Sequence, residues 1–189
     1  MDLQRINLKV YLEEWQVTPE DVFKIFNTWI SKITDEVLVD VADYSHVQSG
    51  PITLLVGYEA NYCIDNTDGE LGLLYARKQP LAGNLSDRLR SIFANALNAC
   101  RRLELEPELA GRVKFRGSEL LLVANDRMSA AATPDIHKIL TADIETVLHD
   151  LFGGADFTVA SNAEPRPALR IKSTAKFEVA TLLENLGEY

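Results

Sequence analysis

Residues 6–33, INLKVYLEEWQVTPEDVFKIFNTWISKI, place an alternating segment directly before an amphipathic one. Apolar side chains at positions 6, 8, 10 and 12 alternate with Asn7, Lys9, Tyr11 and Glu13, which predicts a strand. Thr18 then precedes Pro19 and two acidic residues, the usual start of a helix. Apolar residues at 22, 25, 26, 29, 30 and 33 give that helix one wide apolar face. The stretch therefore predicts a fold in which a sheet packs against helices.

Similar patterns extend along the rest of the chain. Ser86 is expected to cap a second helix, whose apolar face runs from Leu89 to Cys100. A third helical region opens at Thr133-Pro134 and ends at Gly153-Gly154. The predicted strands are residues 37–42, 52–57 (continuing irregularly through 62–64), 71–77 after a turn at 65–69, 113–116 and 120–124 as a tight hairpin around Gly117-Ser118, and 157–160 with 169–172. A short helix over residues 176–186 closes the chain.

This order of elements predicts an α+β fold. We expect a mixed, mainly antiparallel sheet with helices packed on one face, built from helix-plus-hairpin units in succession. No linker rich in Gly, Ser or Pro divides the chain, so residues 1–189 are expected to form a single domain. A subdomain boundary near residues 79–84 is the alternative, because Pro80 and Gly83 mark a connecting loop there.

Composition and charge narrow the possible partners. Hydrophobic residues make up 47% of the chain and charged residues 25%, which is the balance of a folded globular protein. The 19 basic and 28 acidic residues give a net charge of −9, which disfavours binding to nucleic acid. No apolar run approaches the ~20 residues needed to span a membrane. We therefore expect no nucleic-acid partner and no membrane partner.

The cysteines and the first residues indicate a compartment. Cys63 falls in a predicted strand and Cys100 on the apolar face of a predicted helix, so both are expected to be small buried side chains rather than a disulfide framework. Residues 1–5, MDLQR, lack the basic start and apolar core of a secretory signal. A cytoplasmic location is the resulting expectation.

The densest polar group follows the second predicted strand. Asp43, Tyr44, Ser45 and His46 lie at its end, and Glu59 lies just past the next strand, where rigid scaffolds often present functional loops. In a catalytic interpretation, His46 acts as general base or acid and Asp43 or Glu59 orients it or binds substrate. In the structural alternative, His46 is an ordinary loop residue.

Asp40 is unusual because it interrupts an apolar run. Residues 37–42 show little alternation, which predicts a strand buried on both faces. A carboxylate buried there needs a partner, so Asp40 should pair with an arginine or cap a main-chain group.

Arg127 completes the set of candidate ligand-binding residues. It follows the strand 120–124, and if that strand end lies beside the 43–46 loop, Arg127 could clamp an anionic ligand group. The alternative is that Arg127 neutralises Asp40 or Asp43.

Several well-defined chemistries lack their signatures. The sequence has no Gly-x-Ser-x-Gly turn, no phosphate-binding glycine motif and no His-x-x-x-His or paired-Cys spacing. Asp40, Asp43 and His46 form a conceivable but unsupported metal set, so no metal and no cofactor is expected. The turn at 65–69 lacks acids at the first and last positions of a calcium loop. Catalytic residues therefore stay unassigned.

One sequence pattern resembles that of a protein family. Residues 40–46, DVADYSH, followed by Gly50-Pro51 and by residues 55–62, LVGYEANY, are similar to a pattern in an uncharacterised bacterial family. Residues 73–78 and 125–127 share the likeness. The resemblance implies a bacterial origin and carries no assigned activity, so it implies no catalytic residues.

Two functions are compatible with these patterns. The first is a non-catalytic binding or assembly module, expected to be a homodimer because apolar helix faces are ample and catalytic signatures are absent. The alternative is a small-molecule enzyme or ligand-binding domain, with its site at Asp43, Tyr44, Ser45, His46, Glu59 and Arg127.

Overall fold

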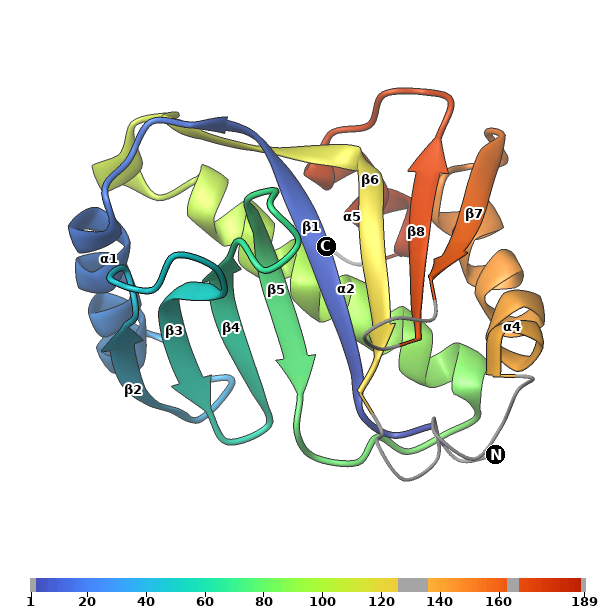
Figure 1. Cartoon of the computed structure of the whole chain (residues 1–189), viewed down its shortest axis with the longest axis horizontal. Helices are drawn as coiled ribbons and strands as arrows, with labels where there is room; N and C mark the ends of the chain where they lie inside the picture. Colours follow the sequence, from blue (N-terminus) through green and yellow to red (C-terminus); the bar gives the residue numbers. More distant parts are fainter. Residues whose placement is uncertain (1–2, 126–135, 163–166, 188–189) are drawn as a thin grey trace.

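The computed structural model describes residues 3–125, 136–162 and 167–187 (Figure 1). In chain order the elements are β1 (Ile6–Trp15), α1 (Pro19–Lys32), β2 (Leu38–Asp43), β3 (Pro51–Gly57), β4 (Ala60–Asp65), β5 (Gly72–Arg77), α2 (Leu85–Glu104), the 3₁₀ turn η1 (Pro107–Leu109), β6 (Val113–Ala124), α4 (Ile136–Leu151), β7 (Phe157–Asn162), β8 (Ala168–Ser173) and α5 (Val179–Leu186).

All the strands of the described residues belong to one sheet. Its order is β2-β3-β4-β5-β1-β6-β8-β7, and each neighbouring pair is antiparallel. The first strand of the chain therefore lies in the middle, while β2 and β7 form the two edges. The predicted α+β class with a mainly antiparallel sheet is confirmed.

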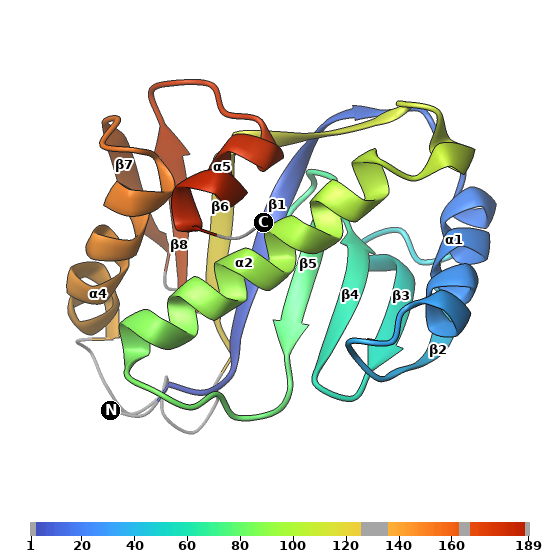
Figure 2. The ribbon, with the colours of Figure 1, turned by 180° about the vertical axis from the view of Figure 1, so that it is seen from behind.

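The helices lie on one face of the sheet, as predicted. Figure 2 shows the helices in front of the strands, with α2 running diagonally across the middle of the sheet. In Figure 1, which is seen from the other side, α2 lies behind the strands. Strand alternation provides the apolar surface on which they pack: Leu8 and Val10 face the helices and are fully buried. The predicted face of α2 from Leu89 to Cys100 is also buried. Within the described residues, the other face of the sheet carries no helix (Figure 1).

Two helices begin at capping boxes. Thr18 accepts a hydrogen bond from the main-chain N–H of Asp21, and the Asp21 carboxylate accepts one from the N–H of Thr18. Asn84 and Asp87 make the same reciprocal pair at the start of α2. The cap of α1 is the predicted residue. The predicted cap of α2, Ser86, lies two residues inside the structure's cap.

Two predictions about strands are wrong. Residues 52–64 form two strands that turn at Tyr58 and Glu59, rather than one irregular strand. Residues 113–124 form the single long strand β6 rather than a hairpin, because β6 pairs with β1 along almost its whole length. Gly117 and Ser118 lie where that pairing changes register, so they mark an irregularity in a strand and not a turn.

The elements gather into two halves around β1 and β6. In the first half, β1 is followed by α1, by the edge strand β2, by β3, β4 and β5 in order toward the centre of the sheet, and by α2. In the second half, β6 is followed in the same way by α4, the edge strand β7, β8 and α5. Because β1 and β6 are antiparallel, the two halves are placed as if by a two-fold axis between them. The loop at 79–84 joins β5 to α2 within the first half.

The irregularity in β6 generates the first prediction. A Cβ atom on Gly117 would lie 2.5 Å from the main-chain oxygen of Phe177, just before α5. The change Gly117→Ala should therefore push this segment away and lower the free energy of unfolding by about 1–3 kcal/mol, measured by urea denaturation. The neighbouring Ser118→Ala change should alter it by at most ~0.5 kcal/mol. Equal effects of the two changes would contradict this account of Gly117.

Candidate functional site

The 43–46 loop lies at one end of β2 and is exposed. The Asp43 carboxylate accepts a hydrogen bond from the main-chain N–H of Ser45 at 2.8 Å. Hydrogen bonds from Ser45 hold the pKa of Asp43 below its ordinary value. The Tyr44 and His46 rings lie 6.5 Å apart, centroid to centroid. The four predicted residues thus share one exposed loop.

Glu59 and the end of β6 lie away from this loop. Glu59 follows the opposite end of β3, where its carboxylate contacts the Arg77 guanidinium at 2.5 Å. Asn125, just after β6, bonds to the main chain of Arg5 at that same end of the sheet. Arg127 lies outside the described residues. Among the described candidates, the structure brings together Asp43, Tyr44, Ser45 and His46 but not Glu59.

Asp40 is exposed, so its predicted burial is wrong. The strand β2 is an edge strand, and the flanking Val37 and Val39 are 63% and 59% exposed. The Asp40 carboxylate accepts a hydrogen bond at 2.8 Å from the main-chain N–H of Val41. Of the two predicted structural roles, the structure shows the main-chain cap.

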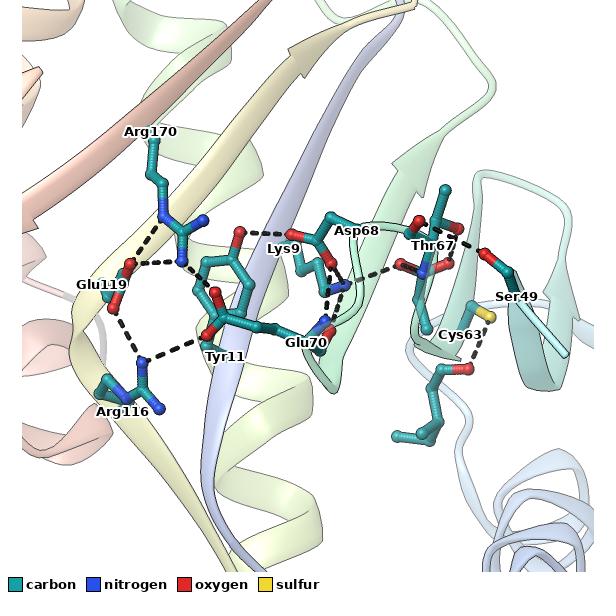
Figure 3. Close-up of polar contacts among 12 residues, drawn as sticks. Lys9, Tyr11, Ser49, Cys63, Thr67, Asp68, Glu70, Arg116, Glu119 and Arg170 are labelled. Atoms are coloured by element: carbon teal, nitrogen blue, oxygen red, sulfur yellow. Dashed lines mark hydrogen bonds and ion pairs between the residues drawn. The ribbon is translucent and has the colours of Figure 1, made fainter. Parts of the chain in front are cut away.

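A buried cluster of charged side chains lies elsewhere, on the face of the sheet without helices. Lys9 on β1 is 1% exposed. Its Nζ donates to the carboxylates of Asp65 and Asp68 at 2.9 and 2.5 Å and to the main-chain oxygen of Glu70 at 2.7 Å (Figure 3). The hydroxyl of Tyr11 donates to the second Asp68 oxygen at 2.7 Å. The loop between β4 and β5 therefore folds over β1.

A second ionic group continues this cluster onto β6 and β8. Glu119 on β6 accepts hydrogen bonds from Arg116 and Arg170 (Figure 3). The Lys172 ammonium lies 2.9 Å from the same carboxylate. Arg170 also contacts Glu70 and lies over the Tyr11 ring. Burial alone would raise the pKa of Glu119, but these hydrogen bonds lower it to about 2. We call the whole cluster the cross-sheet network: Lys9, Tyr11, Asp65, Asp68, Glu70, Arg116, Glu119, Arg170 and Lys172.

The cross-sheet network is a poor catalyst because its groups satisfy one another. Its four cations face four carboxylates, so each charged group already has a partner of opposite sign. Burial, reinforced by Asp68, raises the pKa of Tyr11 far above its ordinary value. Burial raises the pKa of the nearby Cys63 thiol to about 12, with Asp65 acting in the same direction. Neither the phenol nor the thiol is ready to ionise near neutral pH.

The sequence signal for this network was weak. The alternation in β1 places Lys9 and Tyr11 on the face opposite the apolar residues, which normally indicates contact with solvent. The acids of the 65–69 turn have the composition of any hairpin loop. Only the adjacency of β1, β5 and β4 shows that the turn reaches Lys9.

Exposed apolar side chains concentrate beside β2. Among the described residues, seven large apolar residues are highly exposed, and four of them lie on β2 or in the segments next to it. A fifth, Tyr58, lies in the turn between β3 and β4, where its N–H bonds to the main-chain oxygen of Val37. We call these five the edge patch: Val37, Val39, Tyr44, Val47 and Tyr58. Clustering of this kind on a folded surface is typical of an interaction site.

Open pockets also lie on the surface of the described residues. One, of about 640 Å³, lies between the C-terminal half of α2 and the segment before β2, where the Tyr62 hydroxyl donates to Glu36. Another, of about 460 Å³, lies at the N-terminal end of β1 and is lined in part by Asn61 and Lys78. No cluster of three or more His, Cys, Asp or Glu side chains suited to a metal ion occurs within the part of the chain that the structure describes.

Comparisons with protein-family models, with curated proteins and with solved structures found no match to this chain. Among the described residues, no helix has both the length and the apolar character required to cross a lipid bilayer.

The second prediction concerns Lys9. The change Lys9→Met would leave Asp65 and Asp68 facing each other without a cation, and Asp65 is buried. We expect a loss of about 3–5 kcal/mol in the free energy of unfolding, measured in urea at pH 7. Lys176→Met is the matched control. Lys176 is 94% exposed and its ammonium lies as far as 4.0 Å from the Glu13 carboxylate, so this change should cost at most ~0.5 kcal/mol. A similar cost for both variants would show that the Lys9 contacts are not what stabilises the fold.

The third prediction uses the lowered pKa of Glu119. Its folded-state pKa of about 2 lies below the ordinary value of 4.5, so ionised Glu119 stabilises the fold above about pH 4.5 and loses this effect as the pH falls toward 2. Glu119→Gln should therefore cost about 1–3 kcal/mol at pH 6, and the difference from the wild type should shrink by pH 3. Urea unfolding at several pH values measures it.

Glu178→Gln is the control for this pH series. Glu178 also pairs with a lysine, but its side chain is largely exposed. Its removal should have little effect at any pH. A difference between Glu119→Gln and the wild type that stays constant from pH 6 to pH 3 would contradict the assigned pKa shift.

Proposed function

We propose that this chain is a non-catalytic binding and assembly module that forms a homodimer through the edge patch. The observation that carries the proposal is the concentration of exposed apolar side chains along one edge of the sheet. Water contact with such a patch is unfavourable, and burial against a second copy would remove it. The proposal assigns the protein a role in holding molecules together rather than in converting a substrate.

The internal pairing of the polar groups supports a role without catalysis. The cross-sheet network offers no unpaired base, and both cysteines are buried. Glu59 lies at the far end of β3 from His46, so the loop lacks one of the acids that the catalytic interpretation would place beside that histidine. A small-molecule enzyme at the 43–46 loop therefore has less support than a binding surface.

The main chain of β2 indicates what kind of contact the dimer makes. Tyr44 donates its N–H to Ile52 on β3, so by alternation the main-chain groups of Val41 point away from β3. The N–H of Val41 is already bonded to the Asp40 carboxylate. A charged cap of this kind protects an edge strand against pairing with another strand. We therefore propose a contact made by side chains rather than a sheet continued across the dimer.

A two-fold arrangement suits this patch. Homodimers usually associate through the same surface on both copies, so each part of the patch meets a different part of its partner. With the two β2 strands antiparallel, Tyr44 and Val47 at one end would pack near Val37 and Tyr58 of the second copy. Aromatic side chains at both ends are the kind of residue that dominates binding energy at interfaces.

The fourth prediction tests the dimer. Light scattering of the purified chain should give about twice the 21.1 kDa mass of one chain. The double change Val39→Lys and Tyr58→Lys should raise the dissociation constant of the dimer by about tenfold or more, because it places charges in the apolar contact. Both side chains are 59% exposed, so the variant should fold normally.

Leu105→Lys is the control for the dimer. Leu105 is 60% exposed but lies at the end of α2, outside the edge patch. This variant should keep the mass of the wild type. A wild-type chain that scatters as a monomer at high concentration would end the proposal, as would an equal loss of mass in the control.

A further inference from the structure

The pocket at the N-terminal end of β1 has the features of a binding site for a small molecule. Its lining comes from the segment before β1, from β4 and β5, and from the segments that follow β5 and β6. We call it the Asn61 pocket, and its lining residues are Arg5, Asn61, Ala76, Arg77, Lys78, Gln79 and Asn125. It lies beyond the cross-sheet network, toward the end of the sheet opposite the 43–46 loop.

Two asparagine side chains leave buried acceptors beside this pocket. Asn7, Ala76 and Asn61 are direct neighbours across β1, β5 and β4, so they lie in one row on the helix-free face of the sheet. The Oδ1 atoms of Asn7 and Asn61 are both buried, and neither has a hydrogen-bond partner within the described residues. A buried acceptor without a hydrogen-bond partner is unfavourable, so a donor group from a bound ligand would stabilise this row.

Two cations line the same pocket without a carboxylate partner among the described residues. Lys78 is exposed, donates to the main-chain oxygen of Gly57 at 2.7 Å and forms no ion pair with a described residue. Arg5 is also exposed and also forms no ion pair with a described residue. Arg77 differs, because it is bound to Glu59 and to the Tyr75 hydroxyl. In a chain with 28 acidic and 19 basic residues, two such cations at one pocket favour an anionic ligand.

We propose that the Asn61 pocket binds a small organic anion that carries a hydroxyl or amino group near its charge. The anionic group, a carboxylate or a phosphate ester, contacts Arg5 and Lys78. The hydroxyl or amino group donates to Oδ1 of Asn61, the lining residue whose acceptor lacks a partner. Ala76, with its small side chain between the two asparagines, leaves room for the ligand.

The fifth prediction uses matched probes on the full chain. Calorimetry with malate should show binding, and succinate, which has the same two carboxylates without the hydroxyl, should bind about fivefold or more weakly. Glycerol 3-phosphate, compared with malate, distinguishes a preference for a phosphate ester from one for a carboxylate. Failure of all three probes to bind with a dissociation constant of ~10 mM or tighter would overturn the proposal.

Variants assign the contacts. Arg5→Gln and Lys78→Gln should each weaken the binding of the preferred probe by about tenfold. Asn61→Ala should remove the difference between malate and succinate while succinate binding persists. Lys24→Gln, at an exposed lysine on α1, is the control for loss of one positive charge and should bind as the wild type does. Equal weakening by Lys24→Gln would show a nonspecific charge effect and overturn the assignment.

The lining side chains of this site lie outside the edge patch, although the main-chain oxygen of Tyr58 accepts a hydrogen bond from the lining residue Gln79. The single variant Val39→Lys, which changes the edge patch away from that contact, should therefore still bind malate. Loss of malate binding in that variant, with binding kept in Leu105→Lys, would contradict the independence of the two sites.

Discussion

The ion pairs of the buried Lys9 ammonium are the constraint on which the helix-free side of the molecule depends. An ammonium that is removed from water must be paired, and the loop between β4 and β5 supplies both carboxylates and a main-chain oxygen. Gly72 makes room for this arrangement, because a Cβ there would lie 2.8 Å from the Lys9 side chain. The network continues through Tyr11 and Arg170 to β6 and β8, so it ties the two halves of the sheet together.

The two faces of the sheet differ in chemistry, and this difference determines where binding can occur. The helix side of the sheet is occupied by apolar side chains from α1, α2, α4 and α5. On the other side, the cross-sheet network satisfies its own charges at the centre. What remains open lies at the margins, namely the edge strand β2 and the end of the sheet where β1 begins. The proposed dimer contact and the proposed anion pocket occupy these two margins.

The two margins use different physical chemistry. The edge patch is apolar, and its main chain is capped by the Asp40 carboxylate, so its contacts are side-chain contacts. The Asn61 pocket combines a guanidinium, an ammonium and a buried amide oxygen that lacks a partner, so its contacts are directional and charged.

The sequence by itself determined the elements whose signals are local. The spacing of apolar residues and the capping residue Thr18 predicted α1, and strict alternation predicted β1, because both depend on neighbours a few residues away. The sequence also identified the exposed 43–46 loop as one polar group. Only the tertiary structure decided that β2 is an edge, that β6 is one strand, and that Lys9 meets acids more than fifty residues away. Those outcomes depend on which strands become neighbours, and strand pairing joins segments whose relation no local spacing encodes.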